Sequence, residues 1–428
     1  MFKTTIGIVD TVRSMFRRIL VLCVLVCSLG LSLSGCCVAE LTYEPVTITF
    51  SYVVSGFYSE TEYFEQVREE FNEIYPYITV ELETENLGGA GGFNPGEADV
   101  FFASWFNLMG LQGQGAVMSL GPFIEDEESL DLSDFYAEAL NAFQSEGQTW
   151  AIPAGIDVPV VFYNQDLFAQ YGVAYPDTDW TWEDFQAAGL AIRDPGAEIF
   201  GYVPTLYPID LLLFVYQHDG QIYDDAGGFI EPTFDHPLTV EAVEWYADLI
   251  HEYNIAPTPA QLRGQEYGTA VLQGRVGMWT GWLSSRGGED WPVEWDMRWG
   301  VVPFPRDAQS ATLIFVDGYA ISSQTPHPDA CWRWITFLSE HERPSFSVIP
   351  PRRSWAESDA FEDLVGSDVA AAGRASVESD MSLAPIDTSA MFAEPGMFST
   401  FVRAVDQVVR GLATPEEALT RAQEQVER

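Results

Sequence analysis

The sequence is poor in positive charge. Only 20 of its 428 residues are lysine or arginine, against 64 aspartates and glutamates, and Lys3 is the single lysine. Nucleic acids and anionic lipid surfaces are bound largely through basic side chains, so this balance excludes a nucleic-acid partner. The ordinary interpretation of the acidic excess is a solvated surface that favours solubility. A saline or acidic habitat is a further hypothesis that rests on the same excess.

Cysteine and histidine are also scarce. The five cysteines form neither a disulfide framework nor a metal-binding spacing, and the five histidines include no His-Glu-x-x-His pair. Cys331 lies in an apolar helical stretch, where we expect a small buried hydrophobe. A Gly-x-Ser-x-Gly elbow is absent as well. We therefore predict no cofactor, no metal and no enzyme activity, although 64 acids leave a chance carboxylate pair for glycoside hydrolysis open.

The one long apolar run lies at the amino terminus. Arg13, Arg17 and Arg18 precede an apolar segment over residues 19–33. A basic region followed by about 15 apolar residues is typical of a signal peptide and too short for a spanning helix. We assign residues 1–35 to the signal, and Met15 is an alternative start.

The tetrapeptide Leu-Ser-Gly-Cys36 follows this run and resembles the bacterial lipobox. The resemblance implies lipidation of Cys36, with residues 36–45 as a tether, and a location on the extracytoplasmic face of the cell membrane. An ordinary secreted protein cleaved near Ala39 is the alternative.

Apolar residues make up 47% of the chain and aromatic residues 14%, which excludes a disordered protein. A chain of 428 residues is too long for a single core, and it fits two lobes that each bury their own.

The segment from Gln148 to Asp184 is the most informative. The apolar run Val160–Tyr163 predicts a buried strand, and Asn164 then begins a helix that Gly172 ends. Thr181 caps the next helix, with Asp184 three residues later.

The order of residues in this segment, Pro-x-x-x-x-Tyr-Asn-x-Asp-Leu-Phe, then Gly-Val and Trp-Thr-Trp-Glu-Asp-Phe185, resembles the extracellular solute-binding proteins of the sugar (family 1) type. Further along the chain, Gln-Gly274 with Gly281-Trp282, Trp-Gly-Val-Val-Pro-Phe-Pro305 and Phe-Val-Asp-Gly-Tyr319 are similar to later family motifs. These proteins are the capture components of ABC importers. In many members one residue separates the glycine and tryptophan that are adjacent here.

The resemblance implies an α/β, two-lobe, periplasmic-binding-protein-like (type II) fold with three hinge crossings. Each lobe is expected to be a mixed, mostly parallel sheet flanked by helices. We assign residues 46–156 plus 317–347 to lobe 1 and residues 157–316 plus 348–428 to lobe 2.

Local patterns agree with an α/β fold. Alternation over residues 46–50 and 78–82 predicts two strands, and a helix over 60–75 joins them in a parallel βαβ unit. A further helix is expected over residues 132–143.

Aromatic residues near predicted strand ends are candidate ligand contacts. Flat rings can cover the C–H face of a pyranose, while carboxylates, amides and guanidinium groups bind its hydroxyls. For most of these aromatic residues core packing is the alternative interpretation. The predicted ligand-binding residues are Asp157, Trp282, Trp279, Trp105, Tyr319, Asp317, Gly318, Arg352, Tyr52, Tyr207, Trp355 and Phe398.

The resemblance implies a monomeric lipoprotein that captures an extracellular carbohydrate, most simply an oligosaccharide, and delivers it to the permease of an ABC transporter. A binding protein for another solute, such as a polyol phosphate or a peptide, is one alternative. An extracellular glycan-processing enzyme is the other.

Overall fold

The computed structural model describes residues 44–53, 60–85, 98–126, 130–225, 230–258, 261, 267–288, 293–341, 349–383 and 397–427. The predicted signal peptide and Cys36 lie outside the described residues.

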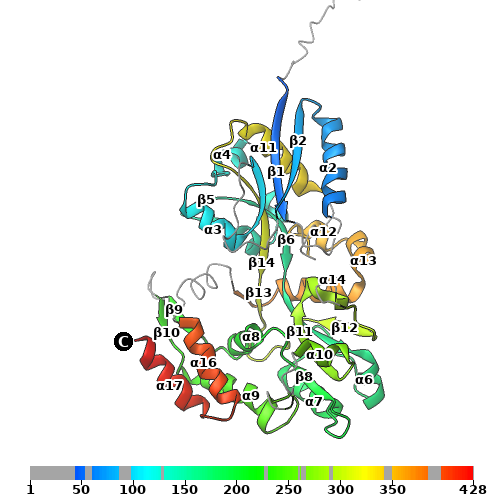
Figure 1. Cartoon of the computed structure of the whole chain (residues 1–428), viewed down its shortest axis with the longest axis vertical. Coiled ribbons are helices and arrows are strands. Elements are labelled where there is room, and N and C mark those ends of the chain that lie inside the picture. The colour runs from blue at the N-terminus through cyan, green and yellow to red at the C-terminus, as the bar shows by residue number, and fades with distance from the viewer. Residues whose placement is uncertain are drawn as a thin grey trace, which may run out of the picture. The chain divides into compact units, whose positions relative to one another are not determined.

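A five-stranded sheet forms the first lobe, in the order β2-β1-β3-β14-β6 (Figure 1). Its strands are β1 (Val46–Val53), β2 (Ile78–Glu85), β3 (Val100–Ser104), β6 (Ile152–Asp157) and β14 (Phe315–Ile321). β1 and β2 pair in parallel across α2 (Glu60–Ile74), which confirms the predicted βαβ unit. The other elements of this lobe are α3 (Trp105–Gly113), α4 (Gly121–Asp126), η1 (Leu132–Asp134), α5 (Ala137–Asn141), the hairpin β4 (Gln144–Ser145) and β5 (Gln148–Thr149), and α11 (Pro328–Glu340).

The second lobe contains a four-stranded sheet in the order β12-β7-β11-β8. Its strands are β7 (Pro159–Asn164), β8 (Phe200–Val203), β11 (Val276–Trp282) and β12 (Trp299–Val302). Two small pairs accompany it: β9 (Tyr223–Asp225) with β10 (Ile230–Pro232), and β13 (Ala311–Leu313) with β15 (Met381–Leu383).

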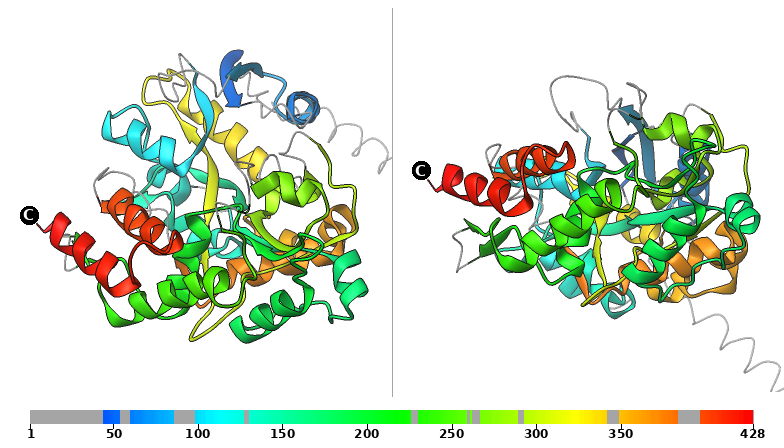
Figure 2. Two further views of the ribbon diagram at one scale, coloured as in Figure 1. Left: turned by 60° about the horizontal axis from the view of Figure 1, so that its bottom comes forward. Right: turned by 90° about the horizontal axis from the view of Figure 1, so that it is seen from below.

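Helices surround this second sheet, and α16 and α17 lie side by side near the carboxyl terminus (Figure 2, orange-red and red). None of the helices described here is both long and apolar enough to cross a bilayer. The helices are α6 (Gln165–Tyr171), α7 (Trp182–Ile192), α8 (Ile209–Gln217), α9 (Pro237–His251), α10 (Tyr267–Leu272), η2 (Leu283–Gly288), α12 (Arg353–Ala356), α13 (Asp359–Val365), α14 (Ser367–Val377), α16 (Met397–Val409) and α17 (Pro415–Val426).

The fold is the predicted mixed α/β architecture with two lobes, but the described sheets are not mostly parallel. In the first sheet β14 runs antiparallel to both β3 and β6. In the second, β7 runs antiparallel to both β11 and β12. Both β14 and β7 adjoin points where the chain passes between lobes, so their direction follows from the crossing and not from a βαβ repeat.

The predicted helix ends in the central segment are confirmed. The Asn164 side chain accepts hydrogen bonds from the backbone N–H groups of Asp166 and Leu167, and Gly172 closes α6 with a φ of 68°. Thr181 and Asp184 form a reciprocal capping box at the start of α7. These short-range side-chain bonds satisfy backbone groups that the helices leave unpaired, which is why sequence alone located them.

The predicted helix over residues 132–143 is wrong at its centre. Phe135 and Tyr136 have extended backbones between η1 and α5. Phe135 forms an antiparallel bridge with Arg352, and the backbone N–H of Tyr136 donates to the carbonyl of Pro351 at 2.9 Å. Pairing with a distant segment therefore overrides the local helical pattern.

Three segments that connect the lobes lie side by side. Ile156 at the end of β6 pairs with Val316 on β14, and its backbone exchanges two hydrogen bonds with Ile349, at 2.9 and 3.0 Å. All three side chains are at most 1% exposed. Figure 1 shows β6 and β14 running from the upper sheet toward the lower one. The crossings thus form a small hydrogen-bonded unit with an apolar interior.

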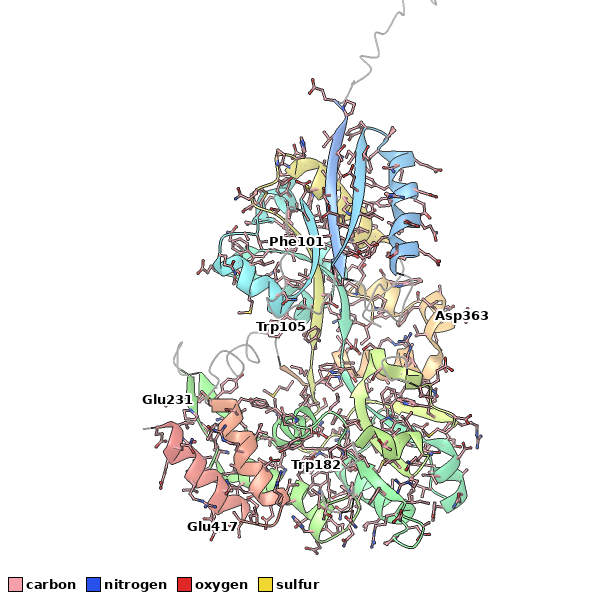
Figure 3. The ribbon with its side chains drawn as sticks, viewed as in Figure 1. Phe101, Trp105, Trp182, Glu231, Asp363 and Glu417 are labelled. Atoms are coloured by element: carbon pink, nitrogen blue, oxygen red, sulfur yellow. The ribbon has the colours of Figure 1, made fainter. Side chains whose placement is uncertain are left out.

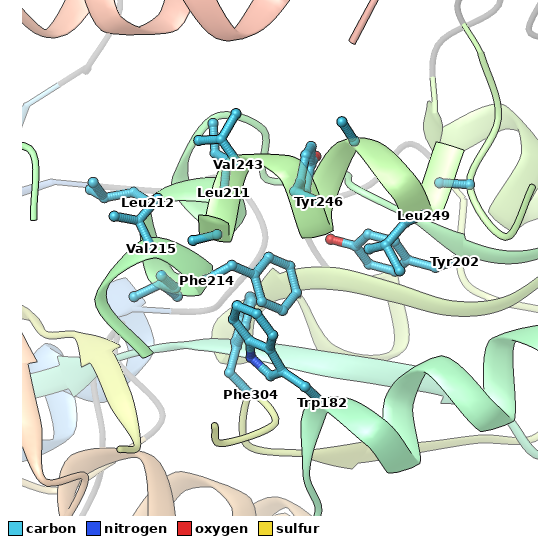
Figure 4. Packing of buried hydrophobic residues seen from close by; sticks show 14 of the residues in the cluster. Trp182, Tyr202, Leu211, Leu212, Phe214, Val215, Val243, Tyr246, Leu249 and Phe304 are labelled. Atoms are coloured by element: carbon cyan, nitrogen blue, oxygen red, sulfur yellow. The ribbon is translucent and has the colours of Figure 1, made fainter. Parts of the chain in front are cut away.

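Buried apolar residues form three clusters. One covers the face of the first sheet under α2 and α11, and a second fills the helical side of lobe 2 (Figure 4). The third contains side chains of both sheets, including Phe101 and Trp279, together with the crossing residues Ile156 and Val316. Cys331 is fully buried on α11, as expected from its apolar surroundings.

One acid lies inside the lobe-2 core. Asp210 on α8 is 0% exposed, and its carboxylate accepts hydrogen bonds from the Tyr202 hydroxyl at 2.8 Å and the Leu211 N–H at 2.8 Å. Burial raises the pKa of Asp210 to about 6, although these hydrogen bonds act in the opposite direction. Between about pH 4 and pH 6 the native state therefore holds a proton that the unfolded state has lost, so stability falls as pH rises through this window.

We predict that Asp210→Asn removes this pH dependence. Two pKa units correspond to on the order of 3 kcal/mol of unfolding free energy, lost in the wild type between about pH 4 and pH 6. Urea unfolding at half-unit pH steps measures the difference between the two slopes. Asp329→Asn, at an exposed position on α11, is the matched control and should keep the wild-type slope. Parallel curves for the wild type and Asp210→Asn would contradict the assignment.

Candidate functional site

The ends of several strands from both lobes meet where the crossings lie. Asp317 on β14 pairs with Ser104, at the carboxyl end of β3, and Phe315 pairs with Asp157, at the end of β6. Trp282, the last residue of β11, pairs with Pro159 next to the first crossing. Ligands of open α/β sheets bind beside the carboxyl ends of strands, so these strand ends form the candidate binding site.

Three aromatic rings link the lobes at this place. Trp105 and Phe315 have ring centroids 6.3 Å apart, and Phe315 and Trp282 have centroids 5.9 Å apart, both in edge-to-face geometry. Trp105 follows the end of β3 (Figure 3) and is 3% exposed, whereas Phe315 and Trp282 are half-buried. Sequence reasoning found both tryptophans and missed Phe315, although its place at the start of the Phe-Val-Asp-Gly strand was a usable signal.

Asp157 adds a fixed carboxylate beside this aromatic row. Its Oδ1 accepts hydrogen bonds from the backbone N–H groups of Val158 at 3.0 Å and Ser284 at 3.1 Å, and its Oδ2 accepts from the Ser284 hydroxyl at 2.6 Å. These bonds connect the first crossing to η2, which directly follows Trp282. The half-buried carboxylate is held in one orientation, and its chemistry is that of a hydroxyl-binding acceptor.

Three other predicted residues gather around a separate cavity. Tyr319, Arg352 and Trp355 line a space of about 30 Å³, together with Glu340, His341 and neighbouring residues. That volume holds one water molecule and not a sugar ring. In this conformation the cavity is too small for a carbohydrate.

Phe315 and Tyr319 of β14 pack in different clusters. The pairing of β14 with β6 shifts register between Asp317 and Gly318, so that Ala154 of β6 is an extra residue there, whereas the pairing of β14 with β3 is continuous. Tyr319 packs against Phe102, with ring centroids 5.7 Å apart, in the cluster under α11, while Phe315 packs with Trp105 in the cluster shared by both sheets.

Arg352 ties the third crossing to lobe 1. Its guanidinium donates to the Ser339 carbonyl at 2.8 Å, lies 3.5 Å from an Asp134 carboxylate oxygen, and stacks over the Phe135 ring at 4.4 Å. The same Asp134 carboxylate accepts two bonds from Ser354, at 2.9 and 2.7 Å. Through these contacts Arg352 anchors the third crossing to lobe 1.

Tyr207 and Phe398 belong to a third group, on lobe 2. Both are half-buried against the lobe-2 core. The Tyr207 hydroxyl donates to Asp406 on α16 at 3.1 Å, and α16 also carries Phe398 near its start. Burial and the neighbouring Asp406 charge raise the pKa of Tyr207, so its hydroxyl stays a donor at physiological pH.

The remaining predicted positions are enclosed. Tyr52 is 1% exposed within the lobe-1 cluster, and Trp279 is 0% exposed in the cluster that spans both sheets. A Cβ on Gly318 would lie 2.6 Å from the Phe143 ring, so this glycine allows close packing of β14. In the described conformation these three residues pack the protein interior.

Among the described residues, no group of three or more histidine, cysteine, aspartate or glutamate side chains is arranged to hold a metal ion. At the strand ends, the oriented carboxylate of Asp157 lies beside the row of aromatic rings.

Comparisons with known proteins address the fold and the family. The family model described as bacterial extracellular solute-binding protein matches residues 59–342. An arabinooligosaccharide-binding protein of Bacillus subtilis is 26% identical over 249 residues, 55% of each chain, and its counterpart in Halalkalibacterium halodurans is 25% identical over 207 residues, 48% of this chain and 44% of that one. The chain thus matches about half the length of these curated relatives.

Solved structures share the fold. The ABC substrate-binding protein Lmo0181 from Listeria monocytogenes, solved with cycloalternan, superposes with a TM-score of 0.69 at 21% identity, covering 90% of this chain and 98% of that one. The sugar-binding protein MalE from Xanthomonas citri gives a TM-score of 0.69 at 18% identity, with 89% and 96% covered. The two-lobe fold predicted from the sequence is therefore confirmed, and the chain belongs to the bacterial extracellular solute-binding proteins.

Proposed function

We propose that this protein captures an extracellular carbohydrate, an oligosaccharide, between its two lobes and delivers it to the permease of an ABC importer. The observation that carries the proposal is the aromatic row of Trp105, Phe315 and Trp282 beside the oriented Asp157 carboxylate. Rings and a carboxylate complement the two kinds of surface that a pyranose presents. Relatives named as arabinooligosaccharide-binding proteins support the same substrate class.

Scarcity of basic residues argues against a phosphorylated ligand. Arg352 is committed to Ser339 and Asp134, and no other arginine is among the predicted contacts. A phosphate group is normally held by several guanidinium or ammonium donors. A neutral, hydroxyl-rich ligand therefore suits the site better than a polyol phosphate.

We further propose that the lobes comprise residues 46–156 plus 317–347 and residues 157–316 plus 348–428, and that they close on the ligand about the three crossings. Hinge closure around a ligand is the established behaviour of periplasmic binding proteins. A ligand shifts the equilibrium between the open and closed forms only to the extent that it binds the closed form more tightly. The protein works as a monomer, held at the extracytoplasmic face of the membrane by a lipid on Cys36.

A thermal-shift screen tests the substrate class. We expect saturating arabino- or malto-oligosaccharides to raise Tm, because a ligand at 100 times its Kd stabilises the native state by about 2.7 kcal/mol. Chromatography of the recovered sugar should show it unchanged. Cleaved products would instead support a glycan-processing enzyme, and a shift given only by a peptide or a polyol phosphate would overturn the carbohydrate assignment.

Two substitutions test the site. Trp282→Ala and Asp157→Ala should each weaken oligosaccharide binding by about 1–3 kcal/mol, because the first removes ring stacking and the second a hydroxyl acceptor. Isothermal calorimetry measures both affinities. Tyr175→Ala, which removes an aromatic side chain 47% exposed and absent from the predicted contacts, is the matched control and should bind like the wild type. Unchanged affinity in both site variants would refute the assignment.

Membrane attachment has its own test. The mature protein from membranes of the native host should carry a mass increment equal to a diacylglycerol adduct on Cys36, and Cys36→Ala should release the protein into the medium. Cys37→Ala is the control, since we assign that cysteine to the tether. A wild-type mature chain without a lipid adduct would contradict the anchor.

A further inference from the structure

The loop that follows β8 runs beside the end of β11. Val203, the last residue of β8, pairs in parallel with Trp279 on β11. Thr205 and Leu206 then contact Thr280, two residues before the end of β11 at Trp282. Tyr207, another predicted ligand contact, lies in this loop. The position of the loop decides whether Tyr207 and Trp282 act on the same ligand.

Thr280 on β11 holds the loop at two points. Its hydroxyl oxygen accepts a hydrogen bond from the backbone N–H of Leu206 at 3.0 Å, and its backbone carbonyl accepts one from the Thr205 hydroxyl. Thr280 itself is 0% exposed, so water does not compete for these bonds.

Asp210 sets the direction of the Thr280 hydroxyl. The hydroxyl donates to Oδ2 of Asp210 at 3.4 Å, and the same oxygen accepts from the Tyr202 hydroxyl at 2.8 Å. A hydroxyl has a single proton. When that proton points at Asp210, the lone pairs of the Thr280 oxygen remain for the Leu206 N–H.

The far side of the loop is held as well. The Tyr207 hydroxyl donates to Asp406 at 3.1 Å, and Asp406 lies on α16, the helix that carries Phe398. The chain of bonds from Asp210 through Thr280 to the loop and α16 thus connects three elements that carry the predicted contacts Trp282, Tyr207 and Phe398.

A buried carboxyl without a basic partner is costly, and an apolar residue of similar size would often be more stable. Among the described residues no salt bridge includes Asp210. The Tyr202 hydroxyl contacts it, and Tyr207, Tyr246 and Tyr267 interact with it electrostatically; Figure 4 shows Tyr202 and Tyr246. Its bonds to Tyr202 and Thr280 give this buried carboxyl a positioning role.

We propose that Thr280 and Asp210 are positioning residues for ligand binding. They fix the 204–208 loop, and with it Tyr207, relative to the strand that ends in Trp282, and they do not touch the ligand themselves. The inference rests on the proposed carbohydrate function for its role in binding. Its structural part, the hold on the loop, is independent of any ligand.

Hydrogen exchange of the ligand-free protein tests the hold on the loop. Thr280→Val keeps the side-chain shape and removes the hydroxyl, so the Leu206 amide should exchange about 3- to 10-fold faster at matched pH. Thr280→Ser restores the hydroxyl and should restore protection. Asp210→Asn should speed exchange in the wild-type background and add nothing to Thr280→Val, because both residues act through one bond. Unchanged Leu206 exchange in Thr280→Val overturns the inference.

Calorimetry with arabinotriose tests the positioning role. Thr280→Val should bind about 3- to 10-fold more weakly than the wild type, and Thr280→Ser should bind like the wild type. If the wild type binds and Thr280→Val binds equally well, the positioning role is overturned. If the wild type binds none of the screened saccharides, the proposed function fails, whereas the exchange comparison still decides whether Thr280 holds the loop.

Discussion

The structure depends on the pairing of the three segments that cross between the lobes. Ile156 is hydrogen-bonded to Ile349 on one side and pairs with Val316 on the other, and all three side chains are removed from water. Backbone hydrogen bonds in a dry, apolar setting resist local separation, because each broken bond leaves a costly unpaired group. The crossings therefore act as one unit, and motion between the lobes has to bend all of them together.

This arrangement also explains how the candidate residues divide. Phe315, at the start of β14, packs with Trp105 and Trp282, whereas Tyr319, four residues further on, packs in the core under α11. Residues close in sequence thus belong to different clusters. The group with the aromatic row and Asp157 is the proposed ligand-binding part, while Arg352 holds the third crossing against lobe 1.

Buried hydrogen bonds also fix the arrangement of elements within lobe 2, as they do at the crossings. Asp210 is fully buried, and its hydrogen bonds with Tyr202 and Thr280 join α8, β8 and β11. Such networks contribute less to net stability than apolar packing does, but they fix orientation, since each group has few alternative partners. For the proposed hydroxylated ligand such fixed orientation matters, because hydrogen bonds form only within a narrow range of donor–acceptor distances and angles.

What the sequence determined by itself was local or carried by family motifs. The caps at Asn164 and Thr181, the first βαβ unit and the two-lobe class follow from short-range patterns and from the solute-binding signature. Tertiary structure alone decided the extended backbone at Phe135, the antiparallel direction of β14 and the face that Tyr319 presents. Each of these depends on partners many residues away, and propensity and periodicity act only over a few neighbouring residues.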